Sequence, residues 1–156
     1  MIEKNPINFP RKKDEGRAQS VSPEVLKKLL ETPDRKTFTG LRDYILILLI
    51  LDTGIRPGEA LKLLPEDFNL DSNEVTVREE IAKTRKKRTL PLSALIALAV
   101  NRLIRCRPRE WWENAPLFCS QDGKPMLESS LTHRFKKYSS QIGYKITPYD
   151  LRHSFV

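Results

Sequence analysis

The sequence predicts an α+β fold that is mainly helical and carries one small three-stranded antiparallel sheet. Apolar residues recur at helical spacing along most of the chain, whereas residues 67–92 hold short runs that alternate with the two-residue period of a strand. Ser or Thr precedes several helical segments and proline often follows it, which is the usual signal for a helix start. With 156 residues, 39% of them hydrophobic, the chain is long enough for one domain with a real core.

Six helices are expected. Ser22 and Pro23 begin the first helix, and Thr39 or Gly40 begins a second that is apolar on most sides. The isoleucines of the second segment would also fit a buried strand, but its length and the stop signal at Gly54 favour a helix. Thr147 and the residues after it form a capping box, and the helix that they start runs to the end of the chain. The expected helices cover 23–31, 40–53, 57–64, 94–105, 129–141 and 148–156.

Strands are expected at 67–70, 74–77 and 87–92, with a turn at 71–73 and a basic hairpin tip at 83–86. A further short strand is expected at 117–119, followed by a turn at 121–124. Residues 1–19 contain two prolines and little apolar content, which is typical of a linker or arm. The predicted organisation is therefore an arm at 1–19 and one domain at 20–156.

The positive charge is concentrated in one part of the chain. Residues 78–109 hold ten basic and two acidic residues, which accounts for the whole net charge of +8. Such a local excess favours a polyanionic partner, most simply nucleic acid, although a solvated basic face would look the same. The longest apolar run has eight residues, too short for the roughly twenty that a membrane span needs. Two cysteines provide neither a disulfide framework nor a four-ligand metal site, so a reduced, cytoplasmic protein is expected.

Three segments carry chemistry. They are TGIRPGEAL at residues 53–61, AKTRKKRTLPL at 82–92 and TPYDLRHSF at 147–155. In this order and spacing they resemble the catalytic domain of tyrosine recombinases, the family of phage and transposon integrases. The resemblance covers nearly all of the chain from Ser22 onward and implies the catalytic-core fold of that family, incomplete at its C-terminal end.

The resemblance implies a role for three cations. Arg56 and Arg152 would bind the nonbridging oxygens of a DNA phosphate, because a planar guanidinium can hold two oxygens at once. An alternative for Arg56 is an ion pair with Glu59, which in the recombinase interpretation would fix the local packing. Lys83 would donate a proton to the leaving 5′ oxygen, helped by neighbouring cations that favour its neutral form. Lys83 could instead be one more contact to the DNA backbone, and Lys86 and Lys87 are rivals for the acid role.

The chain departs from the family pattern in two ways. Tyr149 stands where the family usually has His or Lys, and a phenol can donate a hydrogen bond but brings no positive charge. His153 is expected to be a supporting polar residue or a buried histidine bonded to backbone. The family's nucleophilic tyrosine lies downstream of the third segment, so no nucleophile is expected in this chain, which would then be inactive in strand exchange. No metal or nucleotide cofactor is implied.

Double-stranded DNA is the expected partner, and the whole recombinase would assemble with other protomers on DNA in the cytoplasm, at the nucleoid of a bacterium or archaeon. A non-catalytic DNA-binding or regulatory module with an integrase-like core is the main alternative. An RNA-binding basic domain is a weaker one, since no exposed aromatic platform is visible. The residues expected to contact DNA are Arg85, Lys86, Lys87, Arg88, His133, Arg134, Lys136 and Lys137.

Overall fold

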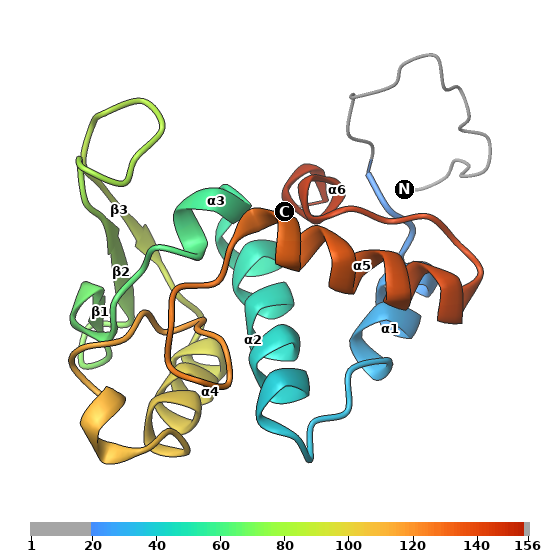
Figure 1. Ribbon diagram of the computed structural model, residues 1–156. Helices are drawn as coiled ribbons and strands as arrows, with labels where there is room; N and C mark the ends of the chain where they lie inside the picture. The colour runs from blue at the N-terminus through green and yellow to red at the C-terminus, as the bar shows by residue number, and fades with distance from the viewer. Residues whose placement is uncertain (1–19, 155–156) are drawn as a thin grey trace.

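The computed structural model describes residues 20–154, which form six α-helices, two 3-10 helices and a three-stranded sheet (Figure 1). The predicted α+β class is confirmed, whereas the arm predicted at 1–19 lies outside the described residues. The helices are α1 Pro23–Glu31, α2 Phe38–Thr53, α3 Pro57–Ala60, α4 Ala94–Arg105, α5 Glu128–Ile142 and α6 Pro148–His153. The strands are β1 Phe68–Asn69, β2 Glu74–Val77 and β3 Arg88–Pro91, and the 3-10 helices are η1 Pro65–Asp67 and η2 Arg109–Trp111.

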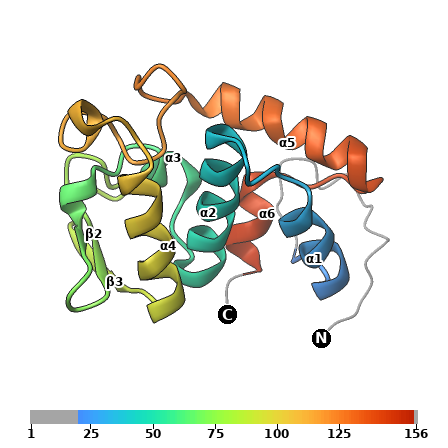
Figure 2. The same cartoon turned by 90° about the horizontal axis from the view of Figure 1, so that it is seen from below.

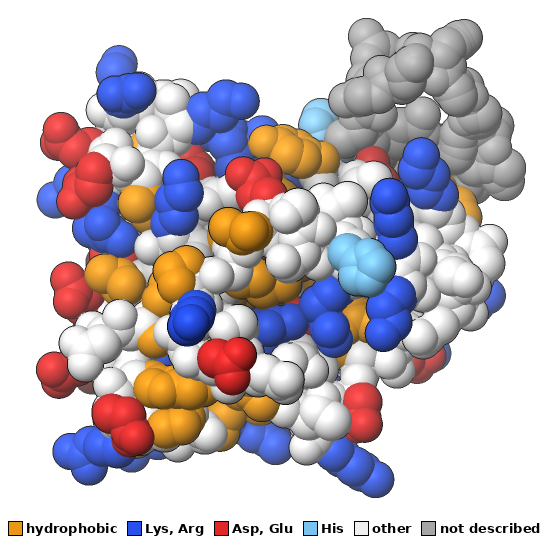
Figure 3. Space-filling model, in the orientation of Figure 1, with side chains coloured by type: hydrophobic (Ala, Val, Ile, Leu, Met, Phe, Trp, Pro, Cys, Tyr) orange, Lys and Arg blue, Asp and Glu red, His pale blue; other side chains and the backbone are white. Residues whose placement is uncertain are grey.

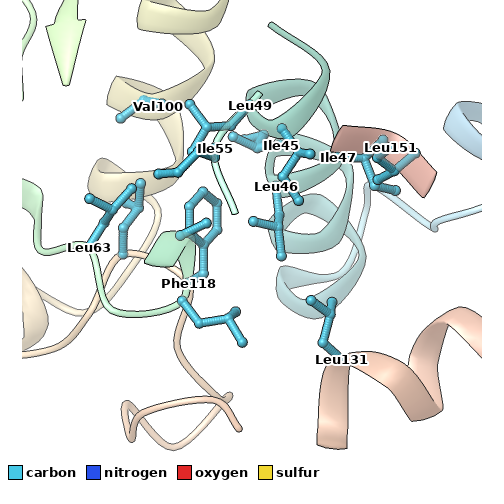
Figure 4. Close-up of a cluster of buried hydrophobic side chains, with 14 of the residues drawn as sticks. Ile45, Leu46, Ile47, Leu49, Ile55, Leu63, Val100, Phe118, Leu131 and Leu151 are labelled. Atoms are coloured by element: carbon cyan, nitrogen blue, oxygen red, sulfur yellow. The ribbon is translucent and has the colours of Figure 1, made fainter. Parts of the chain in front are cut away.

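Helix α2 is the centre of the fold. It packs against α3, α4 and α6, while α1 and α5 contact each other on one side of it and the sheet lies with α4 on the other (Figures 1 and 2). Ile45, Leu46, Ile47 and Leu49 are at most 1% exposed, because the helix is covered on nearly every side. Figure 4 shows these side chains meeting Phe118 and other apolar side chains from several elements. In the described residues, no helix is both long and apolar enough to cross a membrane.

The sheet is a meander in the order β1-β2-β3, with both pairs antiparallel. Val75 and Val77 of β2 are buried, and Val75 pairs with Leu90 of β3. The loop between β2 and β3 extends beyond the sheet on the side where α3 and α6 lie (Figure 1). The basic tip predicted from the sequence is therefore near the two helices that carry the other cationic motifs.

Most predicted helix ends are confirmed by the backbone geometry. Ser22, Ser93 and Thr147 each accept a hydrogen bond from a backbone N–H in the first turn of the helix that follows. Gly54 ends α2 in the left-handed conformation with φ of 72°, where a side chain would be strained. The start of α2 differs from the prediction: the helix begins at Phe38, capped by Thr37, rather than at Thr39 or Gly40.

Several segments differ from their predicted structure. Helix α6 ends at His153, with Ser154 as its C-cap, although the sequence predicted a helix at 148–156. The helix predicted at 57–64 ends at Ala60, and the chain continues in a tighter turn, in which the N–H groups of Lys62 and Leu63 donate to carbonyls three residues back. Leu64 is extended, as the residue before a proline prefers. The strand predicted at 117–119 is reduced to one bridge between Cys119 and Pro125. The backbone N–H of Leu117 instead donates to the carbonyl of Leu63, 2.9 Å away, which ties this segment to the core. Helix η2 was not predicted.

Gly40 offers a test of the packing around the start of α2. A Cβ at this position would lie 1.9 Å from the carbonyl oxygen of Asp34, a backbone atom that cannot move aside cheaply. Gly40→Ala is therefore expected to lower the free energy of unfolding by about 2 kcal/mol or more, despite the better helix propensity of alanine. Denaturant unfolding measures the change. Ser140→Ala, at an exposed position of α5, is the control and should leave stability unchanged or slightly higher; equal stability of Gly40→Ala and wild type would contradict the packing.

Candidate functional site

The carboxylate of Glu59 binds the β2–β3 loop at Lys83 and the start of β3 at Arg88. Glu59 lies in α3 and is 3% exposed. Its Oε1 and Oε2 accept hydrogen bonds from Nη2 and Nη1 of Arg88, at 2.7 and 3.1 Å. Its Oε2 also accepts from the backbone N–H of Lys83 at 2.9 Å. One buried side chain therefore fixes Lys83, which begins the basic tip, and Arg88, which begins the strand after it.

Glu59 remains ionised over the whole physiological range. Burial by itself would raise the pKa of this carboxyl group. The hydrogen bonds and charge of Arg88, together with the backbone N–H groups of Lys83 and Arg56, outweigh burial and lower the pKa of Glu59 to about 2. A buried carboxylate with so many donors is a fixed negative charge, around which the neighbouring cations are arranged.

Arg56 stands at the N-cap position of α3, directly beside this carboxylate. Its backbone N–H donates to Oε1 of Glu59 at 3.3 Å, and its Nη1 lies 3.6 Å from Oε2. The ion pair considered from the sequence therefore forms, but it is the longer of two, because Arg88 takes the close two-point contact. The side chain of Arg56 is 23% exposed, so its guanidinium still reaches solvent, where a ligand could bind.

Arg152 is anchored next to the same corner. Its Nε donates to the carbonyl oxygen of Gly54 at 2.8 Å, two residues before Arg56 in the chain. The end of helix α6 is also tied to the start of the domain, because the hydroxyl of Ser154 accepts a hydrogen bond from the backbone N–H of Val21 at 2.8 Å. Figure 1 shows α3 and α6 side by side, and the two helices are in contact. The structure thus brings the first and third motifs together.

Tyr149 and His153, the other two candidate site residues of the third motif, face solvent. Tyr149 is 40% exposed. The side chain of His153 is exposed and its backbone carbonyl accepts from the hydroxyl of Ser20 at 2.9 Å, so the interpretation of His153 as a buried histidine is wrong. Tyr138, by contrast, donates its hydroxyl to Asp43 in a buried network, which leaves it unavailable as a nucleophile.

The basic tip is open to solvent. Lys83, Arg85, Lys86 and Lys87 are all exposed, and Arg85 adopts a positive φ of 63° that turns the backbone tightly at the tip. His133, Lys136 and Lys137 are exposed on α5. Figure 3 shows Lys and Arg side chains gathered over the β2–β3 loop and again along α5. The loop and α5 therefore each present several exposed basic side chains.

Two of the arginines expected to contact DNA, Arg88 and Arg134, also pair with buried carboxylates, although their side chains remain 29% and 28% exposed. Arg88 binds Glu59, and Arg134 of α5 binds Asp43 of α2 and the hydroxyl of Tyr138. Asp43 is 1% exposed and also accepts from Arg42, at 3.0 Å. Burial, and then the hydrogen bond to Asp43, raise the pKa of Tyr138 to about 12, so the phenol keeps its proton. Both arginines therefore have structural partners that the sequence interpretation did not assign.

Some of these partners could have been read from the sequence. Arg42 and Asp43 are the polar pair at the start of an otherwise apolar helix, which signals a buried ion pair. Arg88, however, sits in a run of basic residues in which nothing marks it as different. Within residues 20–154 there is no group of three or more His, Cys, Asp or Glu side chains that could hold a metal ion.

The fold and this cationic corner define the class of protein, that of the tyrosine recombinases and integrases. Residues 19–156 match the Phage integrase family, and the chain belongs to that family. It is 32% identical over 141 residues to tyrosine recombinase XerA of Pyrococcus furiosus, an alignment that covers 88% of this chain and 46% of the relative. It is 30% identical over 135 residues to tyrosine recombinase XerC of Chlamydia caviae, covering 84% and 42%. The chain thus spans less than half the length of these relatives.

Solved structures agree on the fold. The crystal structure of XerA recombinase superposes with a TM-score of 0.72 at 23% identity, covering 87% of this chain and 48% of that one. XerH site-specific recombinase, bound to a palindromic difH substrate in a post-cleavage complex, superposes with a TM-score of 0.68 at 29% identity, covering 87% and 40%. The Tn1549 transposon integrase in complex with a circular intermediate DNA superposes with a TM-score of 0.71 at 21% identity, covering 89% and 52%.

The charge of Glu59 is expected to stabilise the fold in a pH-dependent way. Because the folded pKa of about 2 lies below the ordinary value of 4.5, the stabilisation is complete above pH 4.5 and is lost as the pH falls toward 2. Glu59→Gln should lower the free energy of unfolding by about 3 kcal/mol at neutral pH, and this difference should shrink in acid. Denaturant unfolding across the pH series measures both. Glu79→Gln, at an exposed loop position, is the control and should change little; a difference that stays constant down to pH 2 would sink the argument.

Proposed function

We propose that this chain is the phosphate-binding part of the catalytic domain of a site-specific tyrosine recombinase, which breaks and rejoins DNA. The observation that carries the proposal is the convergence of Arg56, Arg152 and Lys83 around Glu59 and the carbonyl of Gly54. Those three come from segments far apart in the sequence. The three motifs that carry them resemble those of the family, which supports the same roles for these residues.

In the reaction proposed for the whole recombinase, the hydroxyl of the family's nucleophilic tyrosine, a role given to no residue of this chain, attacks the scissile phosphate. A 3′-phosphotyrosyl bond forms while the bond to the 5′ oxygen breaks. Arg56 and Arg152 bind the nonbridging oxygens and neutralise the charge that develops on them in the transition state. Lys83, on the exposed tip, donates a proton to the leaving 5′ oxygen. The phosphotyrosyl ester conserves the bond energy for rejoining, so the arginines and the lysine suffice without a cofactor.

Tyr149 is where the proposed site differs from the usual family pattern. Its hydroxyl, on an exposed side chain in the first turn of α6, can donate a hydrogen bond to a phosphoryl oxygen where the family usually places His or Lys. It adds no positive charge, which leaves more of the electrostatic work to Arg56 and Arg152. A non-catalytic DNA-binding module is the second candidate, favoured by this same uncharged position.

Duplex DNA is the proposed partner, bound along the exposed cations of the tip and α5, and the whole protein is proposed to assemble with further protomers on it. The recombinase relatives come from a bacterium and an archaeon, which supports a place with the chromosome in the cytoplasm of such a cell. Arg88 and Arg134 also bind buried carboxylates, but their side chains are 29% and 28% exposed, so both stay among the proposed DNA contacts.

The proposed role of the tip predicts a change in the salt dependence of DNA binding. Replacing Lys86 and Lys87 together by Gln should reduce the slope of log affinity against log salt by about 2, because each lysine releases about one counterion on binding a phosphate. Fluorescence anisotropy with a labelled duplex over a salt series measures it. Lys27→Gln with Lys28→Gln, exposed on α1, is the matched control and should leave the slope unchanged. Equal slopes for the two double variants would overturn the assignment of the tip.

If Arg56 and Arg152 bind the same phosphate, their contributions to DNA binding should depend on each other. Arg56→Ala and Arg152→Ala should each weaken duplex binding by about tenfold, and the double variant should lose much less than the product of the two. Arg102→Ala, exposed on α4, is the control and should lose little. Losses that simply multiply, or that match those of Arg102→Ala, would favour the non-catalytic alternative. Circular dichroism of each variant separates lost binding from lost folding.

A further inference from the structure

Two hydroxyl groups tie the end of α6 to the residues that precede α1. The hydroxyl of Ser154 accepts a hydrogen bond from the backbone N–H of Val21 at 2.8 Å and donates one to the backbone carbonyl of Asp150 at 2.9 Å. The hydroxyl of Ser20 donates to the backbone carbonyl of His153, also at 2.9 Å. The segment that leads into the domain and the end of α6 are therefore linked directly, although 133 positions separate the bonded residues.

The linked segment is itself fixed to the core. Val21 is 8% exposed and belongs to the main hydrophobic cluster, as does Leu151 of α6, which is fully buried. A partly buried backbone N–H such as that of Val21 needs an acceptor, and the hydroxyl of Ser154 supplies it. The contact at the end of α6 therefore rests on packed residues, so it can resist a displacement of the helix.

Arg152 depends on the placement of its helix more than the internal arginines do. Its Nε donates to the neutral carbonyl of Gly54 at 2.8 Å, whereas Arg88 makes a two-point contact with the carboxylate of Glu59. A single bond to a neutral acceptor restrains a guanidinium less than a two-point ionic contact does. Because this bond uses Nε, the terminal nitrogens Nη1 and Nη2 are left out of it, and the backbone of α6 decides where they point.

We infer that Ser154 is a positioning residue for Arg152, and that it couples the location of Ser20 and Val21 to the phosphate-binding corner. This inference rests on the proposed function, in which Arg152 binds a DNA phosphate. Ser154 acts through Arg152 and not on the DNA itself. Its hydroxyl holds the last turn of α6 against the entering segment, while Gly54 holds the guanidinium on the other side. A clamp on one phosphate needs such restraint, since small misplacements weaken an oriented contact.

NMR of the isotope-labelled chain measures the positioning without DNA. The Nε–H signal of Arg152 is identified by its absence from Arg152→Ala, and the hydrogen bond to Gly54 slows exchange of this proton with water. Ser154→Ala should speed the exchange by about three- to tenfold, which corresponds to the usual net contribution of a hydrogen bond. Ser154→Thr keeps a hydroxyl and should restore slow exchange. Ser140→Ala, exposed on α5, is the control and should exchange like wild type.

Ser20→Ala is a milder second variant. It removes the bond to the carbonyl of His153 and leaves both bonds of Ser154 in place. Exchange at Nε of Arg152 should rise by about twofold, because the entering segment keeps its main contact with α6. Circular dichroism reports whether each variant folds, and Ser20→Ala decides the question if Ser154→Ala does not fold.

Duplex affinity, measured by fluorescence anisotropy, separates positioning from general stability. Ser154→Ala should weaken binding by about threefold in the chain that has Arg152 and leave binding unchanged in the Arg152→Ala chain, because the two residues act as a unit. A hydroxyl that only stabilised the fold would weaken binding equally in both chains.

Equal exchange rates in wild type and Ser154→Ala, or the same loss of affinity with and without Arg152, overturn the positioning role. A wild-type chain that does not bind duplex DNA overturns the proposed function instead. The exchange rates then still decide whether Ser154 positions Arg152, so the two failures are distinguishable.

Discussion

The arrangement of the cationic corner depends on one buried carboxylate. Glu59 accepts hydrogen bonds from Arg88, from the backbone of Lys83 and from the backbone of Arg56, and so joins the first motif, 53–61, to the second, 82–92. A carboxylate buried without such partners would cost several kcal/mol, and removing one partner from a buried pair is correspondingly destabilising. The fold therefore cannot release the base of the tip without exposing or stranding this charge. That coupling places the backbone of Lys83 even though its side chain extends freely into solvent.

A second buried carboxylate has the same role on the other side of α2. Asp43 accepts from Arg42 of its own helix and from Arg134 and Tyr138 of α5. Because α1, α2, α5 and α6 meet mainly through apolar side chains, which have no directional preference, this ionic network fixes the angular position of α5 against α2. The exposed face of α5, with His133, Lys136 and Lys137, is then turned outward. Each carboxylate binds one arginine, Arg88 or Arg134, and thereby positions the element that carries the exposed basic side chains.

The sequence was a good guide to elements and a poor guide to the partners of charged side chains. Caps such as Ser22, Ser93 and Thr147 act within four residues, so local chemistry predicts them. The pairing of Glu59 with Arg88 spans 29 residues, and that of Asp43 with Arg134 spans 91. In a basic run such as 85–88 every residue has the same local signal, and only the register of β3 decides which guanidinium turns inward. The approach of Arg152 to Gly54 could be anticipated only from the family motifs, because no periodicity links residues that far apart.

The division between internal and external cations bears on how such a site can work. A guanidinium held by a carboxylate has lost much of its conformational freedom, so it can orient its neighbours at little further entropic cost when a ligand binds. Exposed lysines on a tight tip keep that freedom and attract a phosphate backbone from several directions, with an affinity that salt reduces. Arg56 lies between these extremes: its backbone and one nitrogen are held near Glu59, while about a quarter of its side chain remains open. Such partial restraint suits a residue that must bind one phosphate in one orientation. It reduces the number of side-chain conformations to be sampled and leaves N–H donors for the phosphate.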